Sequence, residues 1–343
     1  MIRVYDFDYN LLAETEHAFS SEWELKFNGI GSYEGSFDIN SDFTKVFAEN
    51  RYLILCEDDN QAICVGKRIS DKLTVYGRTP EWLLSKRVVL PFKTSEIFGT
   101  DTYTDPETII LYLLNKAYKE PKVIAEDGTL SDAVNTNAVT EDFIIPEPMG
   151  SQKLTRHFWR NSANPLSDVI KDLCDLWSCG YKLRFNHANK CWDFSFVFGE
   201  KRDLVISKSL KNAYDMSLND SFLEEANGGV FKVYSGSDEE NEAYGYIQNT
   251  ENENKGMLYW EKVLSSASGV SEAEKFIAKS DENITVDCEI AGASYGKDYC
   301  LGDELRVQFE AGPFRTTLHL KVSGVSIINS SAGKSIKPIF SDL

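Results

Sequence analysis

Apolar and polar residues alternate along most of the first hundred positions of the chain. The alternation is clear at residues 23–27 and 33–39, and two further apolar segments, 51–56 and 62–69, flank a polar turn. A period of two residues is typical of strands with one buried face, and a polar turn between two such runs predicts a hairpin. Several short strands at regular spacing favour a small barrel or sandwich.

The spacing changes near residue 100, where a helical pattern begins. Asp105 and Pro106 form a helix start, because the aspartate side chain can cap the first turn and proline fits into it. A second helix is predicted from Pro165, with Gly180 as its stop. Its buried face consists of Leu166, Val169, Ile170, Leu173, Cys174 and Trp177. A hairpin at 181–198 follows, so this middle part is expected to be a compact α+β insert.

Strands return after residue 204, with predicted segments at 230–234, 244–247, 258–263 and 284–290. Two hydrophilic loops interrupt them, at 236–242 and 248–255. Neither loop has enough apolar residues to pack, so both are expected to be exposed and mobile. Ser271 and Glu274 form a capping box that predicts a helix burying Phe276 and Ile277.

The most regular alternation is in the closing hairpin, where residues 304–310 and 314–322 each present one apolar face. Ala311, Gly312 and Pro313 supply the turn between them. Gly302 precedes the first strand and is expected to form a bend that exploits the backbone freedom of glycine.

Together these segments predict an α+β fold, mostly β, in which two small β-barrel domains flank a helical α+β insert. The first barrel, of the tube type, is expected at residues 1–98, with strands near 204–235 as candidates to complete it. The insert is expected at 99–203 and the second barrel at 204–343.

Composition indicates a folded and acidic protein. A chain of 343 residues is long enough for two or three domains, and 42% hydrophobic with 26% charged residues are globular values. The net charge of −18 argues against a dedicated nucleic-acid binder, which needs a basic surface, but suits a conduit whose wall repels passing DNA. Neither a signal peptide nor a membrane helix is predicted, so we expect a protein made in a cytoplasm and soluble there.

The seven cysteines indicate neither a complete disulfide framework nor a zinc module. Their number is odd, and no Cys-x-x-Cys spacing occurs. Five of them lie in apolar runs and are expected to be small buried residues: Cys56, Cys64, Cys174, Cys191 and Cys288.

One enzyme motif appears literally, at Gly292–Gly296, with Ser294 at its centre. A nucleophile elbow needs a helix after the serine. Another strand is predicted there instead, so a glycine-rich connection is the better interpretation. His319 is the candidate general base for Ser294, but its position in the strand predicts a solvated side chain.

We predict no catalytic, cofactor or metal site. His17, His157 and His187 are isolated, and the acidic clusters at 58–59 and 238–240 lack the spacing of a calcium loop. Paired carboxylates for glycoside hydrolysis stay open, since such pairs meet only in the fold. Exposed aromatic residues would bind sugar, although most aromatics here alternate at strand spacing and belong to cores.

The closing hairpin is preceded by a short motif made of Asp298, Tyr299, Leu301, Gly302 and Asp303. This motif and the alternating strand after it resemble the closing hairpin of the siphovirus baseplate hub proteins, a tail protein family related to the N-terminal part of tail-associated (Tal-like) lysins. Matching short motifs also occur at residues 2–6, 23–27, 33–39, 76–78, 83–84, 87 and 90–91.

The resemblance implies a structural protein of the virion, assembled in the host cytoplasm and located in the tail tip or baseplate. Such hubs are homotrimers with two similar barrels per chain, and they adapt a three-fold tip to the six-fold ring of the distal tail protein. The resemblance further implies contacts with the tape-measure protein and with a fibre or receptor-binding protein. It also implies a channel that carries DNA only in transit, during genome ejection. Two alternatives stay open: a tail-associated cell-wall hydrolase and a carbohydrate-binding module.

Overall fold

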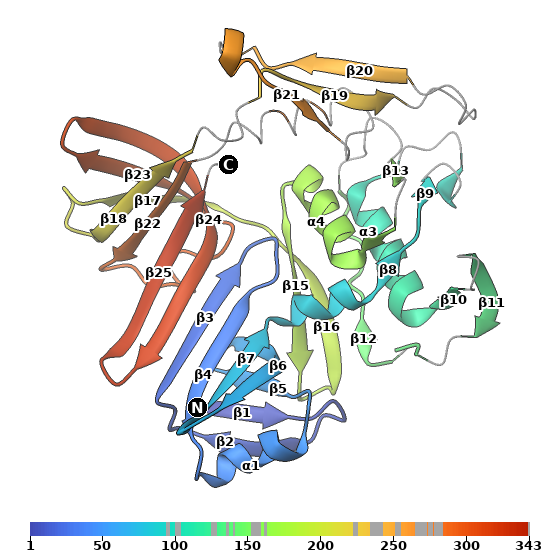
Figure 1. Cartoon of the computed structure of the whole chain (residues 1–343), viewed down its shortest axis with the longest axis vertical. Helices are drawn as coiled ribbons and strands as arrows, with labels where there is room; N and C mark the ends of the chain where they lie inside the picture. Colours follow the sequence, from blue (N-terminus) through green and yellow to red (C-terminus); the bar gives the residue numbers. More distant parts are fainter. Residues whose placement is uncertain are drawn as a thin grey trace.

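The computed structural model describes residues 1–93, 97–99, 104–124, 129–134, 137–139, 141–151, 159–160, 163–221, 226–233, 243–250, 255–264, 273, 277 and 284–341. Strands predominate in these residues, with a few helices among them (Figure 1). The prediction of a mostly β, α+β fold is therefore confirmed.

The N-terminal unit is an antiparallel sheet in the order β3-β4-β7-β6-β5-β1-β2. Its elements are β1 (Ile2–Tyr5), β2 (Leu11–Thr15), β3 (Ser20–Lys26), β4 (Ser32–Asp38), helix α1 (Asp42–Glu49), β5 (Ile54–Glu57), β6 (Asn60–Ile69) and β7 (Lys72–Arg78). The alternation sets the faces, so that Tyr33 and Phe37 are buried. Helix α1 packs Phe43 against Phe37, with ring centroids 5.0 Å apart, and thereby covers one end of the unit.

The C-terminal unit has the strand order β17-β23-β24-β25-β22-β18. Its strands are β17 (Lys201–Ser207), β18 (Ala213–Asp220), β22 (Ile284–Ile290), β23 (Glu304–Ala311), β24 (Phe314–Ser330) and β25 (Gly333–Ser341). The pair of β17 and β23 is parallel and the other pairs are antiparallel.

One long strand, β24, belongs to both units (Figure 1). Its first part, Phe314–Lys321, pairs with β23, and its second part, Gly324–Ser330, pairs with β3 of the N-terminal unit. Buried residues from the two units, such as Trp23 and Val307, accordingly lie in a single hydrophobic core. The two units therefore share one sheet and one core.

Both units are rolled. Glu57 at the end of β5 accepts hydrogen bonds from Nε1 of Trp23 (2.6 Å) and Oγ of Ser21 (2.9 Å), although β4, β7 and β6 separate β5 from β3 in the sheet. In the C-terminal unit a short turn joins the two edge strands, β17 and β18, at one end. Asn212 in this turn donates to the Val205 carbonyl (2.7 Å) and accepts from the Ser207 N–H (2.8 Å) of β17. Among the described strands the pairing is an open path, so closed barrels stay a prediction.

The insert follows the N-terminal unit in the chain and packs against it (Figure 1). Three short elements at the end of the first predicted domain lead into it: η1 (Pro80–Lys86), β8 (Val88–Val89) and β9 (Phe92–Lys93). The elements of the insert itself are α3 (Pro106–Leu114), η2 (Asn115–Lys119), β10 (Lys122–Ile124), β11 (Leu130–Val134), β12 (Phe143–Ile144), β13 (Trp159–Arg160), β14 (Asn164–Pro165), α4 (Leu166–Trp177), β15 (Gly180–Asn186) and β16 (Cys191–Val197). The two predicted helices and the hairpin are confirmed. Asp105 caps α3 by accepting the Thr108 N–H at 2.7 Å. The expected stop at Gly180 is wrong, because Ser178 ends α4 in the left-handed conformation (φ 58°) and Gly180 already begins β15.

A separate three-stranded sheet, which we call the satellite sheet, is drawn at the top of Figure 1. It consists of β19 (Gly228–Val233), β20 (Ala243–Gln248) and β21 (Glu261–Val263), with the short helix η3 (Gly256–Leu258) before β21. The expectation of a wholly exposed loop at 248–255 is wrong at Asn249, which is buried and donates to the Ala226 carbonyl. Residues 236–242, and all but Ala273 and Ile277 of the helix predicted after Ser271, lie outside the described residues.

The closing hairpin is confirmed, with β23 and β24 paired from Glu304 opposite Lys321 to Ala311 opposite Phe314. Its apolar face is buried near the base, at Leu305, Val307, Leu320 and Val322, whereas Phe314 at the tip is 70% exposed. The hairpin therefore extends beyond the core.

Four of the five cysteines expected to be buried are so: Cys64, Cys174, Cys191 and Cys288. Cys56 is only half-buried, because it lies near the end of β5. Cys179, which the argument from apolar runs left out, is buried beside the end of α4.

Candidate functional site at the junction of the units

The ring of Phe27 marks the place where the N-terminal unit, the insert and the C-terminal unit meet. Phe27 follows β3, and a Cβ atom built on Gly180 of β15 would lie 2.9 Å from its ring. A Cβ atom on Gly302, before β23, would lie 2.2 Å from the same ring. The ring thus fits between two backbone segments that approach closely because both residues lack a side chain.

The bend at Gly302 has the geometry expected of it, with φ at +90°. A side chain at Gly199 is also excluded, since its Cβ would lie 1.7 Å from the Gly302 carbonyl oxygen. Next to this contact, the buried carboxylate of Asp303 accepts the backbone N–H groups of Glu200 (2.8 Å) and Cys300 (2.9 Å) and Nε of Arg202 (2.8 Å). The bend is therefore fastened to the chain segment that leaves the insert.

The free edge of β15 docks on the N-terminal unit through side chains. The Gln61 amide accepts the Phe185 N–H at 2.7 Å and donates to the Phe185 carbonyl at 2.8 Å, as a neighbouring strand would. The Leu183 N–H donates to Oε1 of Glu81 at 3.0 Å. These contacts satisfy backbone groups that would otherwise be left unpaired at a buried sheet edge.

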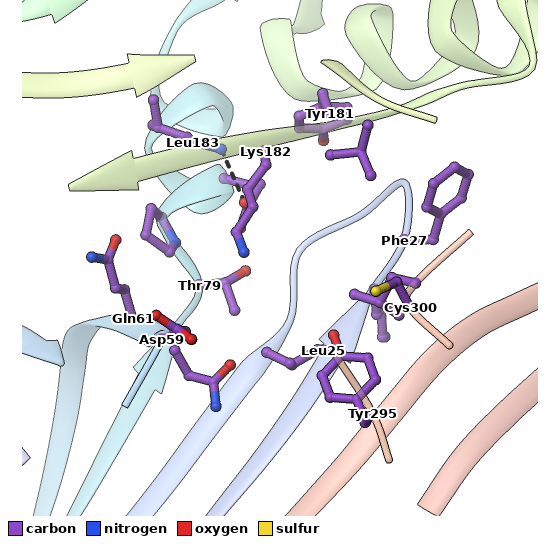
Figure 2. Close-up of a pocket in the computed structure, with 16 residues that line it drawn as sticks. Leu25, Phe27, Asp59, Gln61, Thr79, Tyr181, Lys182, Leu183, Tyr295 and Cys300 are labelled. Atoms are coloured by element: carbon purple, nitrogen blue, oxygen red, sulfur yellow. Dashed lines mark hydrogen bonds between the residues drawn. The ribbon is translucent and has the colours of Figure 1, made fainter. Parts of the chain in front are cut away.

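A cavity of about 230 Å³ lies beside Phe27, and Figure 2 shows Leu25, Tyr181, Tyr295 and Cys300 around it. Its walls come from all three parts of the chain. Burial raises the pKa of the Glu81 carboxyl in its wall, against the opposing effects of the Leu183 N–H and the Lys182 charge. Burial likewise raises the pKa of the Tyr181 hydroxyl. The cavity is mostly apolar, and its buried carboxylate is engaged in holding β15.

The residues of the serine motif are used structurally. No helix follows Ser294; its backbone N–H donates to Asp298 at 2.7 Å within a turn. His319 is part-exposed and lies 3.4 Å from the Glu304 carboxylate on the neighbouring strand. The glycine-rich connection predicted at 292–296 is therefore confirmed.

Buried carboxylates in the described part of the chain also hold backbone segments. Glu107 of α3 accepts the N–H groups of Gly150 (2.7 Å) and Ser151 (3.0 Å), in addition to the bonds described for Glu81 and Asp303. No group of three or more His, Cys, Asp or Glu side chains able to hold a metal ion occurs in the described residues. The described helices include none that is long and apolar enough to cross a membrane.

The sequence predicted the bend at Gly302 but not its neighbours. Phe27 was expected only as one apolar position of a strand, and Gly180 only as a helix stop. Gln61 stood out merely as part of a polar turn. A polar residue in a turn gives no sign of the distant strand edge that it will pair with, so nothing in the sequence connects Gln61 with Phe185.

One known protein family matches nearly the whole chain. The model of a family described as Siphovirus ReqiPepy6 Gp37-like protein matches residues 1–340. No curated protein matches the sequence.

Solved structures show the same fold. The 43 kDa tail protein of prophage MuSo2 from Shewanella oneidensis superposes with a TM-score of 0.58 at 9% identity, over 99% of this chain and 98% of that one. The tail protein from Neisseria meningitidis MC58 gives 0.55 at 11% identity, over 99% and 96%. The prophage tail protein gp18 from Listeria monocytogenes EGD-e gives 0.53 at 13% identity, over 100% and 94%. At these identities the likeness establishes the fold alone.

Proposed function

The chain belongs to the Siphovirus ReqiPepy6 Gp37-like protein family. Because its fold is also that of three prophage or bacterial tail proteins, we propose that it is the structural hub of a phage tail baseplate. In this proposal three copies form a ring at the tail tip, in the virion. The ring adapts the six-fold distal tail protein to a three-fold tip and lines or closes the channel. The protein acts as a structural part and not as an enzyme.

The observation that carries the proposal is the sharing of β24 by two rolled sheets. Each chain thereby presents two strand-built units in a fixed relation, and three chains present six. The six units of a trimer would then match the six subunits of the distal tail protein ring. We accordingly propose the division into barrel domains at 1–98 and 204–343 around the insert at 99–203.

The charge of the chain supports a role beside a DNA channel. A net charge of −18 disfavours tight binding of the DNA phosphates, because a dedicated nucleic-acid binder needs an excess of basic residues. Contacts with the tape-measure protein and with a fibre or receptor-binding protein belong to the same proposal.

Light scattering of the purified full chain, alone and with the distal tail protein, tests the hub. We expect a species of three times the 38.7 kDa chain mass, and six-fold partner rings carrying three copies in electron micrographs. A monomer at high concentration that the ring protein leaves unchanged would contradict the proposal.

A further inference from the structure

The satellite sheet has apolar residues on both faces. Its inner face covers a small core of Ala226, Phe231, Leu264, Ala273 and Ile277. Residues of opposite parity lie on the other side, which we call the outer face. Tyr244 and Tyr246 of β20 and Val263 of β21 belong to it, because Val230 of β19 pairs with both Tyr246 and Val263.

Contacts between neighbouring residues fix the side chains of the outer face in place. The Tyr246 hydroxyl lies over Gly228, where a Cβ atom would approach it to 2.0 Å, and it is 3.0 Å from the Tyr259 hydroxyl. This hydrogen bond raises the pKa of Tyr246 to about 12. Tyr246 of β20 and Tyr259, which lies between η3 and β21, are thus fixed side by side.

The outer face is nevertheless open. Tyr244 is 63% exposed and Val263 78% exposed, and Met257 of η3, just before β21, is fully exposed. Together with Leu258, Tyr246 and Tyr259, these side chains expose on the order of 700 Å², taking roughly 150–250 Å² for a whole aromatic side chain. A typical monomer has a largest apolar patch of about 300–600 Å², whereas each partner in a standard protein interface contributes about 800 Å².

The chemistry of the outer face favours a protein partner over a sugar. Val263, Met257 and Leu258 offer no hydrogen bonds to hydroxyl groups, while Tyr and Met are enriched in the cores of protein interfaces.

We infer, on the basis of the proposed trimer, that the outer face of the satellite sheet docks on a second copy of this chain and is part of the contact that holds the ring together. The exposed area of the outer face together with the adjoining η3 is close to one side of such a contact. A partner copy would complete the second layer over a sheet that is now covered on one side only.

The test places two negative charges on the outer face. The double variant Tyr244→Glu/Val263→Glu is compared with Tyr214→Glu/Ile69→Glu, which adds the same charges at exposed apolar positions of β18 and β6. Each full-length variant is examined by light scattering over a concentration series, with circular dichroism and thermal unfolding to check the fold. A folded outer-face variant should need on the order of 100-fold higher concentration to trimerise, and the control should match the wild type.

The outcomes separate this inference from the proposed function. A trimeric wild type with an equally trimeric outer-face variant would overturn the inference and leave the hub intact. Equal dissociation of both variants would also overturn it, because added charge rather than this face would then be responsible. A wild type that is monomeric with and without the distal tail protein would overturn both.

Glycan-array binding by the wild type that the outer-face variant loses while staying trimeric would identify the face as a carbohydrate site instead. If the outer-face variant does not fold, Val263→Gln, which adds no charge, must still weaken the trimer for the inference to stand.

Discussion

Replacing Gly302 by alanine should destabilise the chain through two separable effects. The new Cβ atom would lie 2.2 Å from Cε2 of Phe27, whose ring Gly180 confines from the other side. Relieving that overlap costs about 1–3 kcal/mol, and an L-residue at φ +90° costs roughly a further 1–2 kcal/mol. The expected loss of about 2–5 kcal/mol is a large part of the roughly 5–15 kcal/mol that stabilises a typical domain.

Gly296 provides a matched control. Its φ is +86°, almost that of Gly302, and no atom lies within 4 Å of where its Cβ would be. Gly296→Ala should therefore show the backbone cost alone. In a Phe27→Ala background the overlap disappears, and Gly302→Ala should then cost no more than Gly296→Ala.

Urea unfolding followed by tryptophan fluorescence gives the free energies by linear extrapolation. The cycle of Gly302→Ala and Phe27→Ala should show a coupling of about 1–3 kcal/mol. If Gly302→Ala and Gly296→Ala unfold at the same urea concentration with Phe27 present, then the fit of the ring between two glycines does not constrain the junction. A Gly302→Val variant that melts and assembles like the wild type would refute the bend as well.

Three further variants address the other junction contacts. Asp303→Ala should lower the free energy of unfolding by about 2–6 kcal/mol, because two backbone N–H groups lose a buried acceptor at about 1–3 kcal/mol each; an unchanged urea midpoint would contradict this. Gln61→Ala should speed amide hydrogen exchange at Phe185, and wild-type exchange there would show that the amide does not protect the edge of β15. For Glu81 the native state binds the proton more tightly than the unfolded state, since burial raises the pKa. Stability of the wild type relative to Glu81→Gln should thus rise as the pH falls from 7 toward the ordinary value of 4.5, and parallel pH profiles would refute the assignment.

Features encoded in a few neighbouring residues were predictable. Asp105 caps α3 because an aspartate followed by proline has that chemistry in any context, and α4 follows from an apolar stripe at helical spacing. The closing hairpin follows from strict alternation on both sides of a turn. The sequence did not reveal where the hairpin leaves the core, since Phe314 continues the apolar pattern although the structure exposes it.

Pairings between distant segments were not predictable. Nothing in residues 314–330 indicates that one half of the strand pairs with β23 and the other with β3, because both partners present similar alternating faces. Glycines carry an equal ambiguity, since the same residue serves a turn, a left-handed cap or a close approach. Gly180 was assigned to the second of these roles, as a helix stop, and has the last.

The shared strand limits how the proposed hub can move. If the two units were to hinge against each other, β24 would have to give up its ladder with β3 or with β23, and the core that spans both units would have to open. The junction adds a second restraint, because Asn28 next to Phe27 also donates to Asp175 of α4 at 2.7 Å and ties the insert to the N-terminal unit. Such units are expected to move as one body. Opening of a channel in the proposed ring would then require rotation of whole chains against one another, and the outer face of the satellite sheet is the described surface at which that rotation would be resisted.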